Sequence, residues 1–232
     1  LGTSFNLPYF HVISHNKDMT FRPTIFDTEI FMFQSEYRQK NKGSSFIADV
    51  GLTRGYESSL EGSNKNSMTH LFSKFNSDLK FKDFSKSDLE IFVEKTSNDT
   101  YLSLFDANIP LSDTKPRNKS LLKSGLKLVL DHEEYNFTSG MTLYETLSGT
   151  NSDRFQYIFP YYNFDTILNT NLKGSFNFSS SGSNDLKNTN NLVSKMSNNL
   201  TYSSEDYFSN QGFRNNCGIH FKNFNATAKN DS

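Results

Sequence analysis

The chain has 232 residues, and its 24 basic and 25 acidic residues leave a formal charge of −1 at pH 7. This balance argues against nucleic acid as the main partner, because binding phosphates needs a concentrated basic face. The longest apolar runs, residues 126–130 and 157–162, fall far short of the roughly 20 residues that a membrane helix needs. A transmembrane helix is therefore excluded, whereas a β-barrel, whose strands alternate apolar with polar residues, is not.

The stretch from Leu7 to Pro23 predicts a β-hairpin with residues 15–16 at its tip. In the register that best separates apolar from polar residues, paired residue numbers sum to 31. The pairs are then Phe10 with Phe21 and Val12 with Met19 on one face, and Tyr9 with Arg22, His11 with Thr20 and Ile13 with Asp18 on the other. This register places Pro8 directly opposite Pro23. Proline has no backbone N–H, so two prolines at one level predict a weak seam.

Nearly every later segment alternates with the period of a β-strand, and no segment predicts a helix. Strands are expected over residues 29–39, 45–52, 68–81, 88–95, 122–131, 135–147, 155–169, 174–180, 191–203 and 212–227, with Cys217, Ile219 and Phe221 on one side of the last. Together with the hairpin they make about a dozen strands. The fourth, sixth, eighth and tenth connections are expected to be long, including the polar loop over 53–67, and the odd-numbered ones up to the ninth short.

Long loops at one end of a sheet are typical of outer-membrane barrels. A soluble sandwich has no physical reason to sort its loops, although Greek-key crossovers would scramble such a count. The predicted fold class is all-β, an antiparallel meander that forms part of a large transmembrane outer-membrane β-barrel.

The sequence contains no catalytic or metal-binding constellation with usable spacing. Its five histidines lie far apart, and no HExxH or GxSxG motif is present. The single Cys217 permits neither an internal disulfide nor a CxxC redox site. We therefore expect no catalytic residue, metal site or cofactor, and no enzyme activity.

Several motifs resemble the barrel of the LPS-assembly protein (LptD) family. The opening SFNLPYFHVISHNKDMTFRPTIF and the following FQSEYRQKNKGSSFIADVGL carry the strongest similarity. The matching elements are an LPYF strand, an N-x-D turn, a T-x-x-P strand and an E-[FY]-R strand. They include Leu7, Tyr9, Phe10, Asp18, Glu36 and Arg38. Residues 93–106 and 155–164 are similar to later parts of that barrel, so scattered similarity covers most of the chain.

The resemblance implies a Gram-negative outer-membrane translocon that inserts lipopolysaccharide into the outer leaflet. Its implied partners are lipopolysaccharide, a plug lipoprotein like LptE, a periplasmic bridge protein like LptA, and outer-membrane lipid. In the family, prolines in the first two strands weaken a lateral gate; Pro8 matches the second of these, and Pro23 matches a proline in the following strand. If Pro8 and Pro23 form a non-hydrogen-bonded pair, Pro8 lacks a donor toward the preceding strand, which makes it the stronger gate candidate.

On this resemblance, residues 1–232 are a piece of a barrel of roughly 26 strands. The family's jellyroll, first strand and closing strands are then expected outside the chain, and the tip at residues 15–16 is expected to be periplasmic. Cys217 matches none of the family's disulfide positions, so a lone buried or lipid-facing thiol is expected. Two alternatives remain open: a general porin or substrate-specific uptake channel, and a soluble β-sandwich adhesin.

Overall fold

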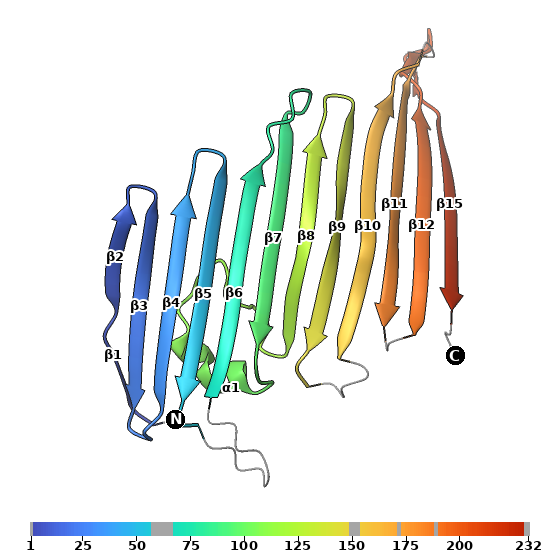
Figure 1. Cartoon of the computed structure of the whole chain (residues 1–232). Helices are drawn as coiled ribbons and strands as arrows, with labels where there is room; N and C mark the ends of the chain where they lie inside the picture. Colours follow the sequence, from blue (N-terminus) through green and yellow to red (C-terminus); the bar gives the residue numbers. More distant parts are fainter. Residues whose placement is uncertain (1, 57–66, 149–153, 171–172, 188–189, 230–232) are drawn as a thin grey trace. The chain divides into compact units, whose positions relative to one another are not determined.

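The computed structural model describes residues 2–56, 67–148, 154–170, 173–187 and 190–229. Thirteen of the described strands form one sheet, and two more form a separate two-stranded sheet. In the large sheet, consecutive strands pair from β3 to β12, β1 and β2 both pair with β3, and β15 pairs with β12 (Figure 1). The all-β antiparallel meander expected from the sequence is confirmed. Within the described ranges, no helix is long and apolar enough to cross a membrane.

The strands follow one another along the chain with few interruptions. Their bounds are β1 Ser4–Asn6, β2 Tyr9–Ser14, β3 Lys17–Phe26, β4 Phe31–Lys40, β5 Ser44–Arg54, β6 Ser67–Asp78, β7 Lys86–Thr96, β8 Leu121–Asp131, β9 Tyr135–Thr146, β10 Phe155–Leu168, β11 Ser175–Lys187, β12 Asn191–Ser203, β13 Tyr207–Phe208, β14 Arg214–Asn215 and β15 Gly218–Lys229. Between β7 and β8 lie a short helix, α1 (Tyr101–Phe105), and a 3-10 turn, η1 (Asp106–Asn108).

Three expectations about elements were wrong. The connection over 97–120 contains α1 and η1, although no helix was expected. The tenth connection is short because β11 continues to Lys187. The last predicted strand begins only at Gly218, after a long connection that contains β13 and β14. The fourth, sixth and eighth connections are long as predicted, but most of the polar loop over 53–67 lies outside the described residues.

Contacts divide the chain into two units. Unit 1 comprises residues 1–78, 89–126 and 143–155, and unit 2 comprises residues 79–88, 127–142 and 156–232. In unit 1 the pairing of β2 to β6 gives the sheet two chemically different faces. One face, the apolar face, carries Phe5, Leu7, Tyr9, Phe21, Ile25, Phe31, Phe33, Phe46, Val50, Leu52 and Leu71. The other, the polar face, carries Asn6, Asp18, Thr20, Arg22, Thr24, Gln34, Glu36, Arg38, Asp49, Thr53 and His70.

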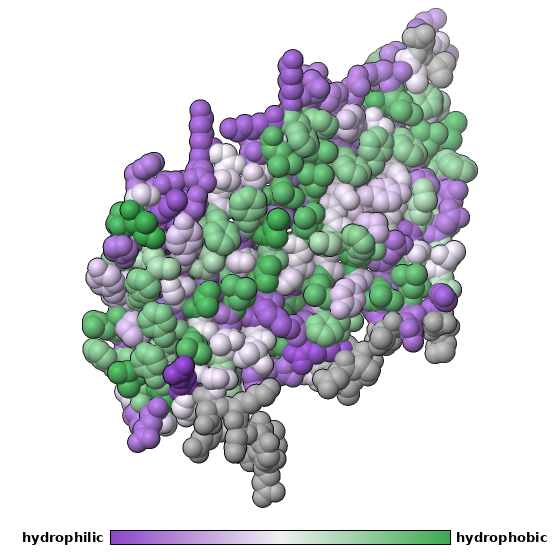
Figure 2. Space-filling view, viewed as in Figure 1, coloured by the Kyte–Doolittle hydropathy of each residue, from purple (hydrophilic) through white to green (hydrophobic). Residues whose placement is uncertain are grey.

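Many of the apolar-face side chains are exposed, among them Phe5, Ile25 and Val50. In Figure 2, green apolar residues gather over the N-terminal strands, and purple hydrophilic residues gather at the upper ends of the strands. The polar face is the more buried of the two: Gln34 and Thr24 have no exposed area. This burial arises because the connection over 97–120 packs against the polar face.

In unit 2, strands β10 to β12 and β15 are rich in Ser and Asn. On one face, two cross-strand rows, Phe176–Tyr202–Ile219 and Phe178–Leu200–Phe221, lie side by side. The next rows on that face mix polar and apolar residues: Ser180 faces Phe164, and Gly182 lies between Tyr162 and Met196. Apolar residues on this face are therefore interspersed with polar ones along the strands.

Candidate functional site

The first hairpin has its tip where the sequence predicts it, but its register is shifted by one residue. Ser14 faces Lys17 across the turn, and an irregularity at Ile13 then changes the pairing, so that Tyr9 faces Phe21 and Val12 faces Asp18. The expected pairs Phe10–Phe21 and Val12–Met19 were therefore wrong. The prediction assumed an unbroken ladder, and one extra residue in a strand moves every side chain beyond it to a new partner.

The corrected register also separates the two prolines. Leu7 lies opposite Pro23, because its N–H donates to the Pro23 carbonyl over 3.3 Å. Pro8 therefore lies opposite Arg22, and the facing Pro8–Pro23 pair was wrong. Since hydrogen-bonded and non-hydrogen-bonded pairs alternate in an antiparallel ladder, Pro8 occupies a non-hydrogen-bonded level. Its missing N–H faces the free edge of the sheet, as the sequence suggested.

Pro23, by contrast, occupies a hydrogen-bonded level and faces the first strand. The bond that a residue at position 23 would return to the Leu7 carbonyl cannot form, because proline has no N–H. The regular ladder is interrupted here: β1 ends at Asn6 and β2 begins at Tyr9. The edge strand therefore lacks a backbone hydrogen-bonding group at two neighbouring residues. Pro8 has no N–H to donate toward the free edge, and the Leu7 carbonyl receives no hydrogen bond from position 23.

Four of the family-motif residues come together on the polar face. Arg38 Nε lies 2.8 Å from Asp18 Oδ1, and its Nη1 lies 3.7 Å from Glu36 Oε1. The guanidinium also lies 6.0 Å from the centre of the Phe10 ring. Glu36 is buried and has a second guanidinium nearby, that of Arg22, at 3.9 Å. These residues form a charged cluster beside the edge strand, which the sequence motif predicts only as separate positions.

The other two motif residues, Leu7 and Tyr9, lie on the opposite, apolar face. Tyr9 stacks on Phe21 with ring centres 6.4 Å apart, and Phe21 stacks on Phe33 at 6.0 Å. Both Leu7 and Tyr9 are more than 60% exposed. The motif therefore divides between a charged cluster on one face and an exposed aromatic row on the other.

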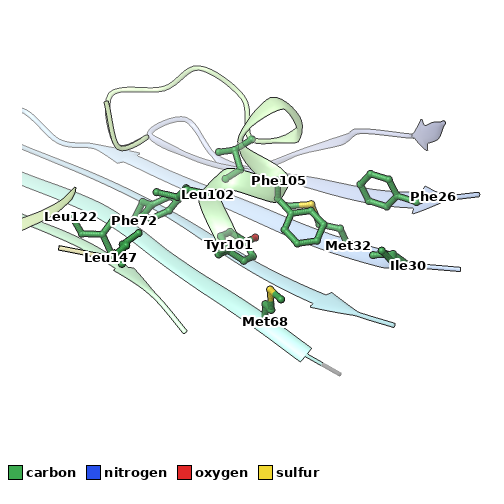
Figure 3. Close-up of a cluster of buried hydrophobic side chains, with 11 residues drawn as sticks. Phe26, Ile30, Met32, Met68, Phe72, Tyr101, Leu102, Phe105, Leu122 and Leu147 are labelled. Atoms are coloured by element: carbon green, nitrogen blue, oxygen red, sulfur yellow. The ribbon is translucent and has the colours of Figure 1, made fainter. Parts of the chain in front are cut away.

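The helix α1 lies on the polar face of unit 1 and forms its hydrophobic core. Figure 3 shows Tyr101, Leu102 and Phe105 pointing from the helix toward Met32 and Phe72 of the sheet. All five side chains are at most 1% exposed. The core is completed by Phe26, Ile30, Met68, Ile109, Leu122 and Leu147. A small apolar island therefore sits within an otherwise polar face, and α1 covers it.

A buried polar chain fixes α1 to the sheet. The Tyr101 hydroxyl lies 2.7 Å from Nδ1 of His70, and Nε2 of His70 lies 3.4 Å from Oδ1 of Asp49. His70 faces Gly51 across β5 and β6. Burial raises the pKa of the Tyr101 phenol, and the nearby Asp49 carboxylate adds to this effect. The phenol therefore stays protonated and can donate to an unprotonated Nδ1.

Ion pairs hold the rest of the connection in place. Asp106 pairs with Lys115 at 3.1 Å and with Lys119 at 2.9 Å. Burial alone would raise the pKa of Asp106, but these two lysines hold it below its usual range. At the start of the connection, Arg154 pairs with both Asp99 and the buried Glu145. Arg154 therefore ties the start of the connection to Glu145 of β9, and the Asp106 pairs hold the rest of the connection to itself.

Sequence reasoning missed this arrangement because nothing marks His70 among five scattered histidines. The only available signal is the register of β5 and β6, which places a glycine opposite it. Cys217 is exposed and precedes β15, so the expectation that it lies within the last strand was wrong, and so was the buried one of its two expected environments. Among the described residues, no group of His, Cys, Asp and Glu could hold a metal ion.

Comparisons with known proteins add no family assignment. No family model matches the chain, and no curated protein matches it.

Proposed function

We propose that this chain is part of an outer-membrane β-barrel of the LptD type, which inserts lipopolysaccharide into the outer leaflet through a lateral gate at the edge of β1 and β2. The motif resemblance in the first 55 residues supports the proposal. The proposed role is the translocation of lipopolysaccharide in a Gram-negative outer membrane, and it needs neither covalent chemistry nor a cofactor.

One observation supports the proposal most: a two-faced sheet ends at an edge strand that proline has weakened. The exposed apolar face of unit 1 suits contact with lipid chains, and the charged polar face suits a water-filled lumen. At the border between the two faces, the edge strand exposes Tyr9 on the apolar face and Phe10 on the polar face. An amphipathic lipid leaving a lumen sideways would need such an edge, where both environments meet and where few backbone bonds must break.

The test is photo-crosslinking in the full-length parent protein during active transport. A crosslinking residue at Phe10 is expected to form a lipopolysaccharide adduct. The control is Val50, which has similar exposure but lies in β5, away from the edge, and it should give no adduct. Active transport without an adduct at Phe10, or equal adducts at both sites, would contradict a gate at this edge.

A second candidate is a porin or substrate-specific uptake channel. The observation that favours it is the connection over 97–120, which lies against the polar face and is fastened there by the Tyr101–His70 contact and by Arg154, which pairs with Asp99 and Glu145. Segments folded into the lumen narrow or plug several kinds of outer-membrane barrel.

Conductance in planar bilayers separates these candidates. If the full-length parent is a channel, removing residues 103–118 should raise its steady single-channel conductance, because the obstruction is gone. If it is a translocon, the intact protein should show no steady ion conductance. A steady open conductance in the intact parent would therefore count against lipopolysaccharide insertion.

A further inference from the structure

An open cavity of about 420 Å3 lies in unit 1, between strands β6 to β9 and the end of the connection over 97–120. Its walls carry hydroxyl, amide, charged and aromatic groups from Ser73, Phe92, Thr114, Asn118, Lys123 and Tyr144. A second cavity of about 530 Å3 adjoins it and shares Lys74, Asp113, Lys115 and Arg117. Volumes of this size are typical of sites for small molecules.

Most of the charges around this cavity neutralise one another. Lys74 pairs with Glu90 at 3.2 Å, and Lys115 and Lys119 both pair with Asp106. The Glu94 carboxylate accepts a hydrogen bond from the backbone N–H of residue 123. These groups form the fixed part of the wall.

Two cations on the wall, Arg117 and Lys123, form no ion pair in the described part of the chain, although the Lys123 charge acts on the nearby Glu94 carboxylate. The Lys123 ammonium lies 5.2 Å from the centre of the Phe92 ring and 5.9 Å from that of Tyr144. Contact with ring faces positions an ammonium without cancelling its charge, so its N–H donors stay available to an anion. Asp113 and Glu94 are the wall carboxylates that form no ion pair within the described ranges, and both limit the net positive charge.

We infer that this cavity binds a phosphorylated sugar, with Lys123 and Arg117 holding the phosphate. A bare phosphate would fill only a small part of the volume. The remaining wall offers hydroxyl and amide groups for sugar hydroxyls, and the edges of aromatic rings for its apolar side. The inference rests on the cavity alone and holds whether or not the chain inserts lipopolysaccharide.

Titration calorimetry of the full chain with glucose 6-phosphate tests the site, with glucose and inorganic phosphate as comparisons. Glucose 6-phosphate should bind at least about tenfold more tightly than either, since only it uses both parts of the wall. Lys123→Gln and Arg117→Gln should each weaken its binding by about tenfold. Lys123→Arg, which keeps the charge, should restore most of the affinity.

The matched control is Lys127→Gln, an exposed lysine on the same strand outside the cavity, and it should leave affinity unchanged. The proposal is overturned if Lys123→Gln, with an unchanged thermal transition, binds as tightly as the parent, or if Lys127→Gln weakens binding equally. Equal affinity for inorganic phosphate overturns the sugar part. Because no membrane or lipopolysaccharide is present, the outcome is independent of the crosslinking result.

Discussion

At the scale of single residues, Gly51 determines whether α1 can dock. A Cβ at this position would lie 2.3 Å from Cε1 of His70 and 3.0 Å from the Tyr101 hydroxyl. Neither ring can move away easily, because His70 stacks on Phe72 with ring centres 4.4 Å apart. A glycine is needed here to leave space for the rings, and not for an unusual backbone angle.

Replacing Gly51 with alanine should therefore destabilise the chain. Overpacking of this kind costs about 1–3 kcal/mol, which should appear as a lower free energy of unfolding in urea. Gly218→Ala is the control, since its Cβ would meet its nearest atom, the Tyr202 carbonyl oxygen, at an ordinary 3.4 Å. If both variants lose the same stability, the contact with His70 is not the cause.

The two prolines should differ in their effect on the edge strand. In Pro23→Thr, the new N–H can donate to the Leu7 carbonyl, and one backbone bond is worth about 0.5–1.5 kcal/mol. Hydrogen exchange of the amides in residues 3–9 should slow by roughly twofold to tenfold. Pro8→Thr adds a donor toward the free edge, so the same amides should exchange as before. Equal slowing in both variants would contradict the register described above.

At the scale of elements, the connection over 97–120 shows where sequence reasoning reaches its limit. Alternating strands could be recognised locally, because burial of one face follows a period of two. The helix α1 has five residues, too few for a helical period to emerge, and it is stabilised by packing on Met32 and Phe72. The contacts that make it a helix lie far away in sequence, as do those that bury His70.

The raised pKa of Tyr101 predicts how α1 responds to alkali. Below pH 10 the phenol is neutral in both folded and unfolded chains, so its contribution to stability is complete. Above about pH 10, the ordinary value, the unfolded chain loses the proton first, and stability falls as the pH rises toward the folded pKa. Urea midpoints measured from pH 8 to 11 should fall less steeply in Tyr101→Phe. Parallel slopes would mean that Tyr101 is not held neutral.

At the scale of the whole molecule, the two-faced sheet is the feature that the sequence predicts best. The alternation fixes which residues share a face within a strand, and this was correct from β3 to β6. The alternation could not predict the change of register at Ile13, because one irregular residue leaves the composition of both strands unchanged. The charged cluster of Asp18, Glu36 and Arg38 therefore emerged only from the pairing.

The assignment of faces can be tested in bilayers that contain lipids with brominated acyl chains. The chain has no tryptophan, so a single introduced one reports on its own surroundings. In the full-length parent, Phe46→Trp on the apolar face should be strongly quenched, and Ile47→Trp on the polar face should not. The two positions are neighbours in β5, so their depth along the strand differs by only about 3 Å. Equal quenching would contradict a lumen on the polar side.

The gap at Pro8 also has a consequence for self-association. A free strand edge invites another copy to add to it, and repeated addition at both edges gives fibres. The edge of β1 and β2 offers no continuous row of donors, because Pro8 interrupts it, whereas β15 has no proline along its length. Copies of this chain that meet should therefore join through β15 alone. Such growth ends at a pair, so the residue that loosens one edge also protects the chain against open-ended aggregation.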